Sequence, residues 1–87
     1  MTEEQIIHGN ALLKKLEELK KERKGLAEIK RDIKANPNSC TVRISARNGY
    51  GGNALVPSMH TIETIIAITE IDYNNQIEAV EKEFNEL

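Results

Sequence analysis

The sequence has little of what usually holds a small domain together. Of its 87 residues only Tyr50, Tyr73 and Phe84 are aromatic, and tryptophan is absent. The single cysteine, Cys40, excludes an intrachain disulfide and fits a reducing compartment, so we expect a cytoplasmic protein. Without large rings a core has to come from leucine and isoleucine, and a chain this short buries a modest fraction of its surface. We therefore expect one domain, 1–87, that self-associates.

Long apolar runs and clustered metal ligands are also missing. No stretch approaches the roughly 20 apolar residues of a membrane span, and the acidic first residues are not followed by the apolar run of a signal peptide. His8, Cys40 and His60 lack the spacing of zinc ligands. The strongly basic face of a duplex nucleic-acid binder is missing as well. The sequence thus predicts no membrane contact, no duplex nucleic acid, no metal and no cofactor.

Charge is unevenly distributed along the chain. Residues 1–35 carry nine Lys or Arg and seven acids, residues 36–57 carry two arginines and no acid, and residues 58–87 carry one lysine and seven acids. The acidic last third is the natural neighbour of the lysine-rich first third. Exposed ion pairs contribute only about 0–1 kcal/mol each, so this pairing sets orientation more than stability.

Heptad-like spacing predicts a helix over 3–35. Thr2 is a plausible N-cap, and Asn36 followed by Pro37 ends the helix. The apolar seam, with spacings of three and four, is Leu12, Leu16, Leu19, Leu26 and Ile33, and Arg23 and Lys30 occupy two further seam positions. This pattern is typical of a coiled-coil helix.

A second helix is predicted over 58–85, with Ser58 as its N-cap. The isoleucine-rich run 62–69 has high β propensity, so a strand is the competing interpretation there. The helix is favoured because no turn residue interrupts 58–73 and because the apolar stripe continues in phase to the end of the helix. Isoleucines on all sides of this run need a cover besides the first helix, either a partner protomer or the apolar face of the hairpin.

Between the helices, residues 41–57 predict a β-hairpin. Residues 41–47 alternate polar and apolar, Asn48 and Gly49 are typical of a hairpin turn, and 54–56 form the returning strand before Pro57. The length of the turn leaves the register open. The fold class expected is α+β, with two long antiparallel helices that are joined by a β-hairpin and self-associate.

The hairpin is the candidate ligand site. Arg43 and Arg47 lie four apart on one strand and leave the same face, where guanidinium groups suit phosphate or carboxylate. Glycine-rich turns offer backbone N–H groups, a tyrosine can stack on a base, and a helix N-terminus favours anions. The candidate ligand-binding residues are Arg43, Ser45, Arg47, Asn48, Gly49, Tyr50, Gly51, Gly52, Ser58 and His60.

Plainer interpretations stay open beside this one. The two arginines could simply be exposed and meet the acids of the second helix, and the run from Lys20 to Lys24 is usually a solvated face. Cys40 and His60 could in principle serve as nucleophile and base, but no third group is identifiable to orient them. We therefore expect no catalytic residues and a non-enzymatic protein.

The layout of a charged helix, a Pro/Asn break, a hairpin closing in Val56 and Pro57, and an acidic helix ending near Phe84 covers the whole chain. It resembles small helix–hairpin–helix proteins of phages and prophages. More loosely it is similar to the viral anti-CBASS and anti-Thoeris sponge proteins, non-enzymatic oligomers that sequester nucleotide immune signals between protomers. It also resembles prefoldin subunits, which place a hairpin between coiled-coil helices.

The resemblance to sponge proteins implies an anti-defence function in the host cytoplasm, if the chain is phage-encoded. The expectation is then a homo-oligomeric binding protein that captures a small anionic ligand of the cyclic-nucleotide or ADP-ribose type. The alternative is a protein–protein interaction module, either a phage inhibitor of a host protein or a prefoldin-like assembly part.

Overall fold

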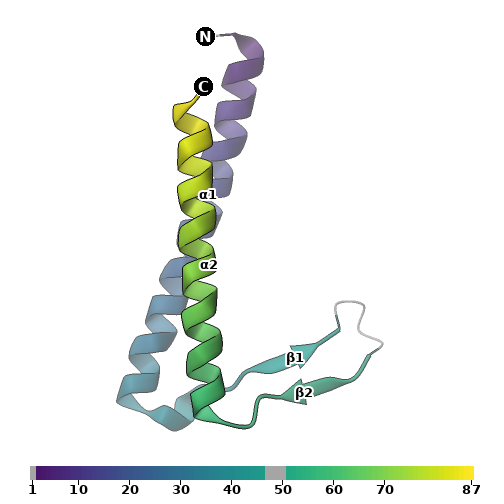
Figure 1. Ribbon diagram of the computed structural model, residues 1–87, viewed down its shortest axis with the longest axis vertical. Helices are drawn as coiled ribbons and strands as arrows, with labels where there is room; N and C mark the ends of the chain where they lie inside the picture. Colours follow the sequence, from purple (N-terminus) through teal and green to yellow (C-terminus); the bar gives the residue numbers. More distant parts are fainter. Residues whose placement is uncertain (1, 47–50) are drawn as a thin grey trace.

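The computed structural model describes residues 2–46 and 51–87. In this part of the chain, the elements are helix α1 (Glu3–Ala35), the short 3-10 helix η1 (Pro37–Ser39), strands β1 (Arg43–Ser45) and β2 (Asn53–Leu55), and helix α2 (Met59–Asn85). α1 and α2 lie side by side in opposite directions, and the hairpin leaves the helix pair at one end (Figure 1). The predicted α+β class, with two long antiparallel helices joined by a β-hairpin, is confirmed.

Local side-chain chemistry explains where α1 begins and ends. The Thr2 hydroxyl accepts a hydrogen bond from the Gln5 backbone N–H (3.2 Å), and the Gln5 side chain accepts one from the Thr2 backbone N–H (2.9 Å). This capping box satisfies amide groups that the first turn of a helix leaves unpaired. At the other end Asn36 has an extended backbone and Pro37 follows it, so the α-helix stops at Ala35. The predicted bounds 3–35 are confirmed.

Ser58 fixes the start of α2, because its hydroxyl accepts a hydrogen bond from the Thr61 backbone N–H (3.2 Å). The helix begins at Met59, one residue after the predicted start, since Ser58 is the cap and lies outside the helix. Residues 62–69 are helical throughout, so the competing strand interpretation is wrong. Ile62 and Ile66 of this run are buried, and their packing outweighs the β propensity of isoleucine.

The regular pairing of the hairpin is shorter than predicted. The strands cover 43–45 and 53–55, where the sequence predicts 41–47 and 54–56. The Val56 backbone N–H still donates a hydrogen bond to the Val42 carbonyl oxygen (2.8 Å), but both side chains turn toward the helices. The residues nearest the helices therefore leave the β-ladder to join the core.

A cluster of buried aliphatic side chains lies where the hairpin joins the helices. Ile33 of α1, Ile62 and Ile66 of α2, and Val56 of the hairpin are buried together there. Partly buried neighbours complete the cluster: Leu26, Cys40, Val42, Met59 and Ile65. The base of the hairpin is thus one cover of the isoleucine-rich end of α2, as one of the two predicted alternatives requires.

Near the chain termini the helices approach each other closely at Gly9, which is buried. A Cβ atom at this position would lie 3.3 Å from Leu87 Cδ1 and 3.6 Å from Phe84 Cε2. The missing side chain therefore leaves room for the last residues of the chain to pack across α1.

Polar contacts also join the helices. Lys30 Nζ lies 2.9 Å from Glu70 Oε2, and His8 Nε2 lies 3.2 Å from Glu83 Oε1. The seam residue Arg23 donates a hydrogen bond from Nη1 to Asn74 Oδ1 (3.0 Å). Lysine-rich α1 and acidic α2 are neighbours, as their charge predicts.

The molecule is thin, with extents of 51 × 34 × 15 Å. Among the described residues seven hydrophobic side chains are buried, and none of them is completely buried. On the helices, Ile7, Ile68 and Ile71 are 63%, 62% and 60% exposed. A single layer of paired helices thus leaves much of its apolar surface in contact with solvent.

Candidate functional site

The described strands hold the first of the predicted ligand-binding residues. Arg43 lies opposite Leu55, and Ser45 lies opposite Asn53, so these four side chains share one face of the ribbon. Arg43 Nη1 donates a hydrogen bond diagonally across the ribbon to Asn53 Oδ1. All of these residues are exposed. The hydrogen bond therefore holds the guanidinium group on an exposed face of the ribbon, where an anion can reach it.

The same ribbon also exposes apolar side chains. Ile44, paired with Ala54 on the opposite face, is 63% exposed, and Leu55, beside Arg43, is 51% exposed. A two-stranded hairpin is at best marginally stable in water without further packing. The hairpin therefore presents both cationic and apolar surface, and its strands have hydrogen-bonding edges that no third described strand covers.

The turn of the hairpin carries the centre of the predicted site. Arg47, Asn48, Gly49 and Tyr50 lie outside the described residues, so their roles stay predictions. Gly51 and Gly52 are exposed. A Cβ atom at Gly51 would lie 2.8 Å from Ala46 Cβ, so only glycine allows the strands to approach this closely there.

The remaining predicted residues, Ser58 and His60, lie at the other end of the ribbon. The Ser58 hydroxyl is engaged by the Thr61 backbone N–H and by the Thr61 hydroxyl, 2.9 Å away. His60 is exposed on the first turn of α2. At ~3.3 Å per residue, six residues of extended chain separate Gly52 from Ser58 by up to about 20 Å. A ligand contacting all the described members of the predicted site would have to lie along the ribbon.

Other candidate chemistries gain little from the geometry. Cys40 is half-buried against the core cluster, with its Sγ 4.0 Å from the Thr41 carbonyl oxygen, whereas His60 is exposed. Within residues 2–46 and 51–87, no three His, Cys, Asp or Glu side chains are grouped to hold a metal ion. In the same ranges no helix combines the length and apolar character needed to cross a membrane.

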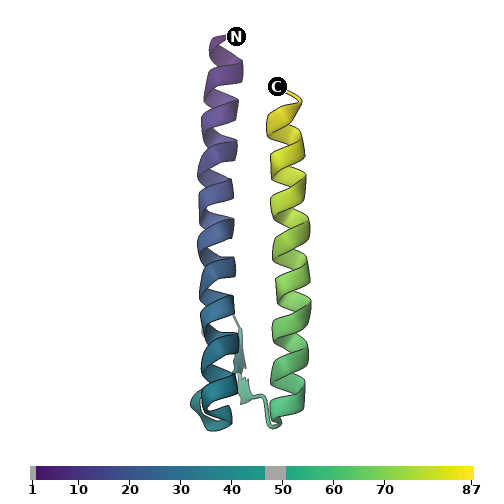
Figure 2. The ribbon, with the colours of Figure 1, turned by 90° about the vertical axis from the view of Figure 1, so that its left-hand side faces the viewer.

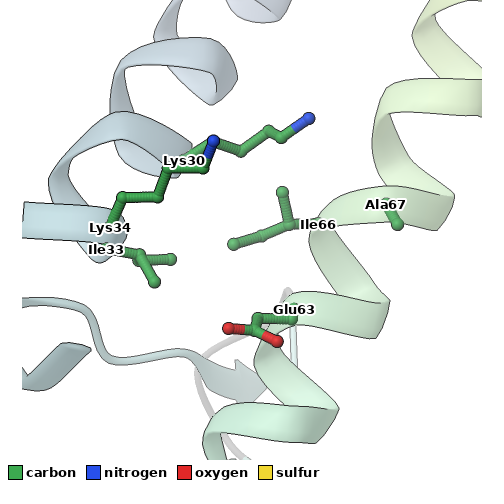
Figure 3. A pocket seen from close by; sticks show the side chains of 6 residues that line it. All are labelled: Lys30, Ile33, Lys34, Glu63, Ile66 and Ala67. Carbon is green, nitrogen blue, oxygen red and sulfur yellow. The ribbon is translucent and has the colours of Figure 1, made fainter.

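A groove between α1 and α2 is the feature that the sequence interpretation misses. It consists of two adjoining hollows between the helices, the larger with a volume of about 480 Å³, and a third beside them on α1 alone; all three share Lys30. Figure 3 shows its end nearest the hairpin, where Lys30, Ile33 and Lys34 face Glu63, Ile66 and Ala67, and the hairpin lies behind them. Turned so that the hairpin points away, the molecule presents this face with both helices side by side (Figure 2). The groove thus opens on the face opposite the hairpin.

Positive charge dominates this groove, which we call the cationic groove. Its described lining carries six cationic side chains and two carboxylates, a net charge of +4. The cations are Lys20, Arg23, Lys24, Lys30, Arg31 and Lys34, and the carboxylates are Glu63 and Glu70.

Lys30 is paired with Glu70, and Arg23 is hydrogen-bonded to Asn74, whereas the other four cations form no ion pair with any described residue. Clustered like charges raise the local potential and attract anionic groups.

The spacing of these residues carries a signal that could have revealed the groove. Lys20, Lys24, Ala27, Arg31 and Lys34 follow one another at intervals of four and three, so they form a second stripe beside the apolar seam. Without knowledge of which seam α2 covers, this stripe looks like a solvated face.

No protein family, curated protein or solved structure matches this chain.

Proposed function

We propose that this protein is a non-enzymatic interaction module that self-associates through its helices and holds its β-hairpin out to a ligand or partner. The observation that carries the proposal is the large surface of the isolated chain. It exposes 6993 Å² at a mass of 9.8 kDa, whereas a compact monomer of that mass exposes about 5,200 Å².

The excess of about 1,800 Å² is the size that an obligate interface requires. Obligate dimers bury roughly 2,000–5,000 Å² in total, which is about 1,000–2,500 Å² on each protomer. The exposed isoleucines of α1 and α2 supply apolar surface for such burial, at about 25 cal/mol per Å². Self-association therefore adds stability to a fold whose own core is small. The single cysteine fits a role in a reducing compartment such as the cytoplasm.

Mass measurement in solution tests this proposal. We expect multi-angle light scattering to give an integer multiple of the 9.8 kDa protomer at micromolar concentration. Because apolar burial drives the association, we expect Ile71→Glu, which places a charge at a 60% exposed position, to lower the measured mass. A wild-type chain that stays monomeric up to about millimolar concentration would refute the proposal, because its self-affinity would then be weaker than that of a specific interface of standard size.

Capture of a small anionic ligand at the hairpin is the second candidate function. One observation favours it: among the described residues Arg43 forms no ion pair with the acids of α2, so its charge is available for a ligand. Calorimetry with cyclic nucleotides and ADP-ribose derivatives tests it. We expect Arg43→Ala to weaken binding, whereas Ile44→Ala, at an exposed position on the opposite face of the ribbon, serves as the control and should bind like the wild type. If Arg43→Ala binds the ligand as tightly as the wild type does, the hairpin is not the binding site.

A further inference from the structure

We propose that a second copy of this chain docks on the face opposite the hairpin, in the antiparallel direction, with its acidic α2 end in the cationic groove. The arrangement is two-fold symmetric, so the acidic α2 end of each protomer lies in the cationic groove of the other. The inference rests on the self-association proposed above and adds to it the surface, the direction and the register.

The face opposite the hairpin has positive charge at one end and negative charge at the other. On α2, Ala67 and Asn74 line the cationic groove. Glu81 lies a further seven residues along, and Glu78 lies between, so both carboxylates continue the same stripe toward the termini. Both are exposed. Within four turns of helix, the stripe therefore changes from residues that line the groove to acidic residues.

α1 changes character on the same face and in the same direction. Toward the hairpin its stripe holds Lys20 and Lys24 of the groove, and toward its N-terminus the 3–4 spacing continues through Glu17 and Leu13 to Ile6. Leu13 and Ile6 are 42% and 49% exposed. The half of the face near the termini thus carries Glu17, Glu78 and Glu81 against Lys82, a net negative charge, together with exposed apolar side chains.

In an antiparallel pair the cationic half of one protomer lies against the acidic half of the other, whereas in a parallel pair halves of the same charge lie against each other. In the antiparallel arrangement the carboxylates of one copy meet the lysines of the other at both ends. In the parallel arrangement lysines face lysines and carboxylates face carboxylates, and like charges placed together across an interface cost several kcal/mol. Complementary charge therefore selects the direction of docking.

Charge also sets the register, and the register is compatible with full overlap. Ala67 at the groove and Glu81 at the acidic end are 14 residues apart, about 21 Å along the helix at ~1.5 Å per residue. Matching the two ends places the two-fold axis beside Asn74, halfway between them. The midpoint of α2 (Met59–Asn85) is residue 72, so the offset is about 3 Å. Charge matching and maximum burial therefore call for nearly the same arrangement.

Charge reversal tests the proposal with two variants of the full chain. The groove variant carries Lys24→Glu and Lys34→Glu, and the acidic-end variant carries Glu78→Lys and Glu81→Lys. We expect each to weaken its own association by about 10–100-fold, because each interface then contains like charges at both ends. Mixed together, the two variants should pair with each other at near wild-type affinity, since every reversed contact is opposite in sign again.

A control variant with Lys15→Glu and Lys21→Glu changes net charge as much as the groove variant does, but neither residue lines the groove. We expect it to associate like the wild type in sedimentation velocity. Pairing of the mixed variants also shows that each of them is folded.

The outcomes separate this inference from the function beneath it. A wild-type chain that is monomeric refutes self-association and the docking together. A wild-type oligomer that neither reversal weakens, or reversal variants that fail to pair when mixed, overturns the docking and leaves self-association standing. If a groove variant loses binding of ADP-ribose while its oligomeric state is unchanged, the groove belongs to a small anion and the docking is wrong.

Discussion

Substituting alanine for Gly25 should stabilise the protein, and the size of the effect follows from helix propensity. In a helix interior alanine is favoured over glycine by about 1 kcal/mol. Gly25 lies well inside α1, and a Cβ atom there meets nothing within 4 Å, so no steric cost offsets the gain. For a domain of this size, about 1 kcal/mol raises Tm by roughly 4–8 °C.

Gly9 provides the matched comparison within the same helix. The propensity gain is the same, but its added Cβ would lie 3.3 Å from Leu87 Cδ1, so the leucine has to shift by a few tenths of an ångström. We expect Gly9→Ala to gain less than Gly25→Ala. In a Leu87→Ala background, which removes the obstruction, the gain at Gly9 should approach that at Gly25.

Thermal and urea unfolding, followed by circular dichroism, measure both effects. One protein concentration has to be used throughout, because self-association raises the apparent stability by mass action. If Gly25→Ala lowers Tm, or if Gly9→Ala stabilises more than Gly25→Ala does, the described packing of α1 is wrong at these positions.

Three further predictions concern the cap, the core and the seam. Ser58→Ala should cost about 1 kcal/mol in urea unfolding and Ser58→Asp much less, because aspartate also caps; equal losses would argue against the cap. Ile66→Ala should cost about 2–5 kcal/mol, whereas alanine at the 62% exposed Ile68 should change the stability of the dissociated chain by no more than about 0.5 kcal/mol. Arg23→Leu with Asn74→Leu should raise Tm and broaden the oligomer distribution in light scattering, because a polar seam pair fixes register at a cost in stability; an unchanged distribution would contradict that role.

The ends of the helices were predictable because their signals are local. Thr2, Pro37 and Ser58 act on the residues beside them, and no distant contact is needed to interpret them. The bounds of the strands depend on more than local alternation. Val42 fits a strand by pattern, but its side chain packs on the core cluster that helix residues provide, so the strand begins after it.

The candidate site was predictable in part. The exposed Arg43 face follows from alternation in the strand, and the register that brings Asn53 to Arg43 does not, because a long turn permits several registers. The cationic groove needs tertiary information. Lys20 and Lys24 line it together with Asn74 only because α2 packs on the adjacent seam of α1, and nothing local to the lysines specifies that.

The direction in which the hairpin leaves the helices has a consequence for valency. The ribbon extends from one end of the helix pair and away from the cationic groove (Figures 1 and 3). Two protomers joined antiparallel through the groove face would carry their ribbons at opposite ends and on opposite outer sides, separated by a span comparable to the 51 Å length of one protomer. Such a pair would bind a repeating or two-site target bivalently, and its avidity would depend on whether the target's spacing matches this separation.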